Sequence, residues 1–365
     1  MNLSFDDFRK TLSDEEKEVL DKILSDESRK KRIVLENNVL DDNNHLEIVN
    51  FCANFFSPGQ PIAERTGYSL ALLEPMYPLN VKNFDLGLFR KENSSLILVE
   101  CKSSISDYRE LVSDLGRSIS EATNRKDELE RVLGNRIADP IEFAICVPAL
   151  DAPEVYNEIV RTNKPICVWA ASLWERKMKI FGNKEDTKTE IESGRLHRDG
   201  NLNSVLGTGV EPKLNFLRTI SILPSSHMCT LLVHVSVLIY QKTKESRISG
   251  EFQYSDVLNI LMKELQTMTG LSTEDFERSA TNIFNTALKK DIFKDLTEDT
   301  EELTRKIFQI SGRRTNSNVV RKEVGETYVA HNAREKALME SIARYEKERG
   351  ITHVTSWMSD QNNKK

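Results

Sequence analysis

Two apolar runs separated by a polar turn make up residues 83–102, which read NFDLGLFRKENSSLILVECK. Each run has the length and the apolar, aromatic and β-branched content of a buried strand, and the polar residues between them are typical of a turn. The stretch therefore predicts an antiparallel hairpin. If Phe89 pairs with Leu96, the same register places Asp85 directly opposite Glu100.

Two carboxylates and an amine gather at the end of this predicted hairpin. Directly opposed side chains have Cβ atoms about 4.5–5.5 Å apart, so Asp85 and Glu100 repel each other unless a proton or a cation lies between them. Alternation along the second strand puts Lys102 on the same face as Glu100 and turns Cys101 towards the core. Hard Mg²⁺ suits a few carboxylates supplemented by water and substrate phosphate, and a neighbouring lysine orients or deprotonates the attacking water. These groups predict metal-assisted phosphodiester hydrolysis.

The Glu-x-Lys spacing alone carries little information. Only the copy at Glu100 and Lys102 ends an apolar β run and faces an acid on a hairpin partner. A plain ion pair at a strand end is the alternative interpretation. The same spacing recurs in three other places without such a context, at residues 15/17, 175/177 and 211/213.

With this acid, acid and lysine arrangement, the segment resembles the core of the PD-(D/E)xK nuclease superfamily, which includes most type II restriction endonucleases. The resemblance is close over residues 83–103 and looser over about 43–171. Phe84 stands where the motif's name has proline. The resemblance implies an α/β fold in which a mixed β-sheet is sandwiched by helices, and an activity on double-stranded DNA.

The resemblance also implies roles for individual residues. It assigns four positions of the motif: Asp85, Glu100 and the backbone carbonyl of Cys101 as Mg²⁺ ligands, and Lys102 as the amine that positions water. Such folds often add an acid from the helix before the strands. Glu47 fits that place, with Glu64 as its competitor and an ordinary exposed glutamate as the alternative.

Apolar periodicity divides the rest of the chain. Strand-like runs at 69–74, 84–89, 96–102, 142–147 and 166–170 alternate with helical stretches at 43–56, 106–133 and 153–162. This pattern predicts the α/β domain independently of the motif. The sequence predicts five regions: an N-terminal extension of two small amphipathic helices (1–40), the nuclease core (41–180), a linker or surface excursion (181–213), a mainly helical domain (214–350) and a flexible tail (351–365).

The helical C-terminal domain is expected to recognise DNA or to mediate dimerisation. Its closely spaced helices favour either a helix-turn-helix or winged-helix module, with 273–290 reading the DNA, or a plain helical bundle. A basic cluster interleaved with small polar residues is a better candidate for phosphate contact, with Arg313 and Arg314 at its centre. Its members are Arg305, Lys306, Arg313, Arg314, Arg321 and Lys322.

Composition narrows the class of protein. The 365 residues carry a formal net charge of −6, the wrong sign for holding nucleic acid by bulk electrostatics, although bound metal ions neutralise an acidic cleft. Five scattered cysteines without a C-x-x-C pair indicate a reducing compartment, and histidines without ligand spacing argue against zinc. The chain has no apolar run of membrane-spanning length and no secretory signal, so we expect a cytoplasmic protein that does not bind membranes.

The sequence is compatible with three functions. The first is a type II restriction endonuclease that cuts double-stranded DNA, with a homodimer expected because one site per chain must cut two strands. The second is a nuclease of repair, recombination or transposon-end cutting, and the third is a DNA-binding protein in which the site is inactive.

Overall fold

A computed structural model describes residues 5–81, 84–182, 186–213, 219–245, 250–297, 302–312 and 315–350. The chain forms two compact units. The first, here called the sheet unit, comprises residues 41–226 and 258–279. The second, here called the terminal unit, comprises residues up to 40, 227–257 and from 280 onwards, so it draws on both ends of the chain. The units therefore do not follow the simple linear division that the sequence predicts.

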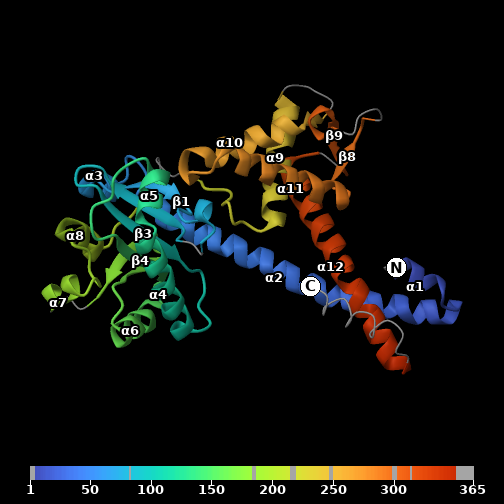
Figure 1. The fold of residues 1–365 in the computed structure, drawn as a ribbon, viewed down its shortest axis with the longest axis horizontal. Helices are drawn as coiled ribbons and strands as arrows, with labels where there is room; N and C mark the ends of the chain where they lie inside the picture. The colour runs from blue at the N-terminus through green and yellow to red at the C-terminus, as the bar shows by residue number, and fades with distance from the viewer. Residues whose placement is uncertain are drawn as a thin grey trace. The chain divides into compact units, whose positions relative to one another are not determined.

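A six-stranded mixed β-sheet forms the centre of the sheet unit (Figure 1). Its strands lie in chain order: β1 (Ser69–Leu73), β2 (Leu86–Arg90), β3 (Ser95–Cys101), β4 (Glu142–Pro148), β5 (Cys167–Ser172) and β6 (Lys177–Phe181). The first three strands and the last pair are antiparallel, whereas β3, β4 and β5 are parallel. The predicted mixed sheet is confirmed. The sixth strand, β6, lies outside the predicted runs, because two of the five residues of its sequence KMKIF are lysines at alternating positions.

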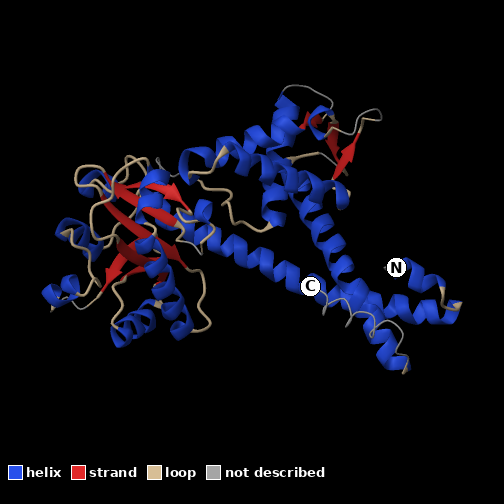
Figure 2. Ribbon diagram, in the orientation of Figure 1, coloured by secondary structure: helices blue, strands red, loops and turns tan. Residues whose placement is uncertain are grey.

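Helices cover both faces of this sheet (Figure 2). One face packs against a core that includes residues of α2 (Asp14–Phe55), α3 (Pro61–Thr66) and α8 (Gly200–Thr208). The other face packs against α4 (Tyr108–Asn124), α5 (Lys126–Leu133) and α6 (Ala152–Thr162). Along β3 the two cores alternate, with Ile97 and Val99 in the first and Leu96 and Leu98 in the second. This alternation decides which helix each functional side chain of β3 faces.

The N-terminal helices differ from the prediction. After the short α1 (Phe5–Lys10), a single helix, α2, runs through both the second expected small helix and the helix expected at 43–56. Residues 14–55 contain neither glycine nor proline, and each Asp or Asn in a helix costs only up to about 0.7 kcal/mol, too little to break it. A capping box starts the helix: the Ser13 N–H donates to Glu16 Oε2 at 2.8 Å, and the Glu16 N–H donates to Ser13 Oγ at 3.4 Å.

The expectation of a linker at 181–213 also needs correction. This stretch contains α7 (Thr187–Glu192) and α8, and Leu202, Val205 and Leu206 of α8 are buried in the core of the sheet unit. The Asp199 side chain caps α8 by accepting from the N–H groups of Asn201 and Leu202. Helices this short show too few apolar repeats for a period to be visible, which is why the polar composition was misleading.

The C-terminal region is mainly helical, as predicted. It contains α9 (Met228–Glu245), α10 (Tyr254–Thr269), α11 (Thr273–Lys289) and α12 (Ser317–Arg349), with α10 and α11 shared between the two units. A small antiparallel sheet was not predicted; its strands are β7 (Glu251–Gln253), β8 (Phe293–Asp295) and β9 (Ile307–Ile310), with β9 in the middle. Two short 3₁₀ helices, η1 (Tyr77–Leu79) and η3 (Leu303–Arg305), complete the described elements.

In the terminal unit, α12 packs against the beginning of the chain. Phe5 of α1 and Leu20 and Ile23 of α2 share an apolar core with Ile342 and Tyr345 of α12. Among the described residues, none of the helices combines the length and apolar character that crossing a bilayer requires. The tail expected at 351–365 lies outside the described residues.

Candidate active site

The predicted register of the hairpin is confirmed. Phe89 pairs with Leu96, and the ladder continues to the pair Leu86 and Val99. Asp85 is the next residue, and its backbone N–H donates to the Val99 carbonyl at 2.9 Å. The sheet therefore brings Asp85 to the end of β3 that carries Glu100.

Two fixed donors hold the Asp85 carboxylate. Its Oδ2 accepts from the backbone N–H of Cys101 at 2.6 Å, and its Oδ1 lies 2.9 Å from Nε2 of His45 on α2. Asp85 is 4% exposed, and the hydrogen bond and charge of its carboxylate raise the pKa of His45 despite the burial of the imidazole, which lowers it. Each carboxylate oxygen retains a second lone pair, so this arrangement orients the carboxylate and leaves it able to bind a cation.

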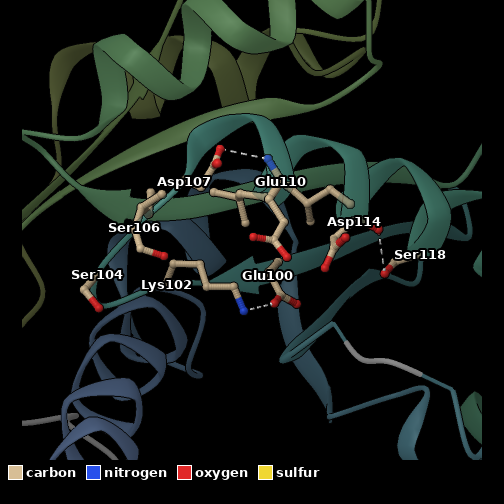
Figure 3. Close-up of a pocket in the computed structure, with 11 residues that line it drawn as sticks. Glu100, Lys102, Ser104, Ser106, Asp107, Glu110, Asp114 and Ser118 are labelled. Carbon is tan, nitrogen blue, oxygen red and sulfur yellow. Dashed lines mark hydrogen bonds and ion pairs between the residues drawn. The ribbon is translucent and has the colours of Figure 1, made fainter.

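Glu100 and Lys102 form an ion pair on the face of β3 that α4 covers (Figure 3). Lys102 contacts Oε1 of Glu100, whereas Oε2 of Glu100 is buried and has no hydrogen-bond partner among the described residues. Burial and, after it, the charge of Asp85 raise the pKa of Glu100 to about 7, although Lys102 opposes both effects. For Lys102, burial lowers the pKa, but the charges of Glu100 and Asp85 outweigh it and the pKa is raised. The single ammonium group of Lys102 therefore does not neutralise the negative charges of both carboxylates, Glu100 and Asp85.

Two further acids face this pair from α4. Glu110 and Asp114 lie one helical turn apart and line the same pocket as Glu100 and Lys102. Figure 3 shows both carboxylates directed towards Glu100. The pocket measures about 210 Å³, enough for several waters at about 30 Å³ each. The sequence holds a signal for both acids, since positions 110 and 114 flank the apolar face of the helix that follows the motif.

A third buried acid lies beside Asp85. The Glu74 backbone N–H donates to the Asp85 carbonyl at 2.8 Å, and the Glu74 carboxylate accepts from the Ser225 N–H at 2.8 Å and contacts the Ser225 hydroxyl. Burial, opposed by the Ser225 hydroxyl and assisted by the charge of Asp85, raises the pKa of Glu74 to about 7. Glu74 adopts a left-handed backbone with φ of 44°, which is uncommon for a residue with a side chain. No sequence pattern pointed to it.

The acid expected from the preceding helix does not join this cluster. Glu47 is exposed on α2, and it is His45, two positions earlier, that contacts Asp85. Residues two positions apart point in nearly opposite directions on an α-helix, so Glu47 faces away when His45 faces Asp85. Its competitor Glu64 is half-exposed on α3 and pairs with Lys213 at 2.9 Å.

The basic cluster is described only in part. Arg313 and Arg314 lie outside the described residues. Arg305 pairs with Glu302 at 2.9 Å, and Lys306 pairs with Asp295 at 2.7 Å. Lys322 lies 3.9 Å from Glu326 on α12. Local acids therefore offset at least three of these positive charges.

The donors of the site are carboxylate and carbonyl oxygens, which suit a hard cation such as Mg²⁺ or Ca²⁺. The residues fit such a cation on two counts: a buried carboxylate oxygen lacks a partner, and acidic side chains outnumber basic ones around it. Comparisons with protein-family models, with curated proteins and with solved structures gave no match to this chain. The assignment of a function therefore rests on the site itself.

Proposed function

We propose that this protein is a Mg²⁺-dependent endonuclease that hydrolyses double-stranded DNA, with a site of the PD-(D/E)xK kind. The observation that carries the proposal is the unpartnered, buried Oε2 of Glu100, placed beside Lys102 and facing the acids of α4. A buried anionic oxygen without a donor is costly, and a bound cation would remove that cost.

The chain order of the sheet unit supports the proposal. A helix (α2), an antiparallel meander (β1 to β3), a helix (α4) and a strand parallel to β3 (β4) follow one another. The nuclease superfamily that the motif resembles has a helix, a meander carrying the motif, a helix and further strands. Asp85 directly precedes β2 and Glu100 lies near the end of β3, so the antiparallel pairing brings both acids to one end of the meander.

In the proposed mechanism, Asp85, Glu100 and the backbone carbonyl of Cys101 would hold Mg²⁺. The bound ion would supply Lewis-acid activation of the scissile phosphate and of water. Lys102, kept protonated by its two carboxylate neighbours, orients the attacking water and stabilises the negative charge that develops on the phosphate. His45 and the Cys101 N–H fix the orientation of Asp85.

His45→Ala is expected to lower Mg²⁺ affinity or cleavage about 10- to 100-fold, the usual effect of losing a group that orients a metal ligand. A titration of cleavage rate against Mg²⁺ would measure this change. His45→Gln, which keeps a donor, should recover part of the loss, and Asn44→Ala, an exposed neighbour on α2, should cost nothing. Equal activity of His45→Ala and the wild type would remove His45 from the mechanism.

Asp114→Asn and Glu110→Gln are expected to weaken Mg²⁺ binding about tenfold each, because both carboxylates add negative potential at the pocket. Isothermal titration with Mg²⁺ would report the affinity directly. Glu121→Gln, an exposed acid further along the same helix, is the matched control. If all three variants bound Mg²⁺ equally well, α4 would only cover the apolar core and would contribute nothing to Mg²⁺ binding.

The C-terminal elements support a DNA-reading role. The order of elements in this region matches that of a winged helix-turn-helix module: α9, β7, α10, α11, β8 and β9. The pairing of β7 with β9 is also the one expected in such a module. Helix α11 exposes Arg278, Asn282 and Asn285, side chains that can read base edges. We therefore propose α11 as the recognition helix, with Arg313 and Arg314 as phosphate contacts and a homodimer as the cutting species.

Incubation of the purified full chain with plasmid DNA and Mg²⁺, with EDTA as control, tests the proposal. Discrete bands would indicate a type II restriction endonuclease. Cutting confined to branched or damaged DNA would instead indicate a repair or recombination nuclease. DNA binding without Mg²⁺-dependent cutting would overturn the assignment as an enzyme.

A further inference from the structure

Three cysteine thiols meet inside the core of the sheet unit, on the face of the sheet away from Glu100 and Lys102. Cys52 comes from α2, Cys101 from the end of β3 and Cys146 from β4. Their Sγ atoms all lie within 4.8 Å of one another, and all three side chains have 0% exposure. Cys101 and Cys146 are direct partners in the parallel ladder, so the sheet fixes two of the thiols side by side.

This spacing suits a single thiophilic cation. A zinc–sulfur bond is about 2.3 Å long, so thiolates in tetrahedral geometry around one zinc ion lie about 3.8 Å apart. The observed upper limit of 4.8 Å is within reach of small side-chain rotations. Thiolate sulfur selects soft or borderline cations such as Zn²⁺ and Cu⁺, whereas the carboxylate oxygens across the strand select Mg²⁺. Alternation along β3 thus separates two sites of different chemistry.

We propose that Cys52, Cys101 and Cys146 form a binding site for one thiophilic cation, Zn²⁺ or Cu⁺. Binding releases thiol protons as the sulfurs become thiolates. The bound cation would join α2, β3 and β4 at one point. Because the Cys101 N–H also donates to Asp85 at 2.6 Å, the cation would fix the strand end on which the carboxylate site is built. The inference does not depend on the nuclease assignment.

The test uses the full chain, reduced, unfolded and refolded with Cd²⁺, a zinc substitute that gives an ultraviolet thiolate-to-metal charge-transfer band. One equivalent per chain is expected to saturate the band. Cys146→Ala and Cys52→Ala should lose it. Cys167→Ala is the matched control, since Cys167 is buried in the same core on the neighbouring strand β5 but outside the cluster, and it should keep the band.

A second measurement needs no variant. X-ray absorption at the zinc edge of the wild-type protein refolded with Zn²⁺ should show three sulfur neighbours at about 2.3 Å, and the melting temperature should rise by several degrees. A competition titration of Cu⁺ against bound Zn²⁺ decides which cation binds more tightly. A shell of oxygen and nitrogen only, or a Cd²⁺ band of equal strength in Cys146→Ala, would overturn the proposal.

Discussion

Glu100→Gln is expected to lower Mg²⁺-dependent DNA cleavage at least 10³-fold and at the same time to stabilise the protein in EDTA. The loss of activity follows from removing a metal ligand, because a metal supplies several kcal/mol to the transition state and about 4 kcal/mol corresponds to 10³ in rate. The gain in stability follows from removing a buried carboxylate whose second oxygen has no partner. Cleavage assays and thermal unfolding in EDTA measure the two effects.

The control for this prediction is Glu175→Gln, an exposed glutamate in one of the other Glu-x-Lys copies, which should change neither property. Opposite signs for activity and stability are the distinguishing result. A purely structural ion pair with Lys102 would give a less stable Glu100→Gln protein. Undiminished cleavage by that variant would remove the proposed mechanism.

The metal-free protein is expected to lose stability as the pH rises from about 4.5 to about 7. Glu74 and Glu100 each have a pKa of about 7 in the folded state, against 4.5 ordinarily, so the folded state holds more protons than the unfolded state in this window. Stability therefore falls with rising pH, by up to about 3 kcal/mol for each group. His45 acts in the same direction, because its raised pKa gives stability that is lost as the imidazole deprotonates.

Urea unfolding at pH 5 and pH 7.5 in EDTA would measure this difference. Glu74→Gln should remove about half of it, since Glu100 still titrates. Addition of Mg²⁺ at pH 7.5 should restore the stability of the wild-type protein, because the cation compensates the charge of Glu100. The same addition should not stabilise the Glu100→Gln variant. A stability that stays constant or rises between pH 5 and pH 7.5 would show that the pKa values of Glu74 and Glu100 are not raised in the folded protein.

The hairpin could be predicted down to its register because the information is local. A short polar connection joins two apolar strands, and the pairing of Phe89 with Leu96 then fixes every other pair as far as Leu86 and Val99. The placement of Lys102 on the same face as Glu100 follows from the alternation of side chains along a single strand. The six-stranded sheet follows nearly as directly, since five of its strands are apolar runs bounded by turns.

The remaining groups of the site depend on packing between distant segments. His45 reaches Asp85 from a helix 40 positions earlier, and an error of two residues in the assignment of the helix face selects Glu47 instead. Glu74 reaches Ser225 across 151 positions. The thiol cluster needs residues from three elements, so none of its members shows a ligand spacing along the chain. Such contacts become visible only when the sheet and its covering helices are assembled.

The single long α2 has a consequence for work with fragments. Its start signal is the Ser13 and Glu16 pair, whereas the compact sheet unit begins at residue 41. A polypeptide trimmed to that boundary would begin inside a helix, and its first four backbone N–H groups would have no acceptors. Fraying of that new first turn would reach His45 itself. An inactive excised sheet unit would therefore report the damage done by trimming, and Ser13 marks the point before which a shortened protein should begin.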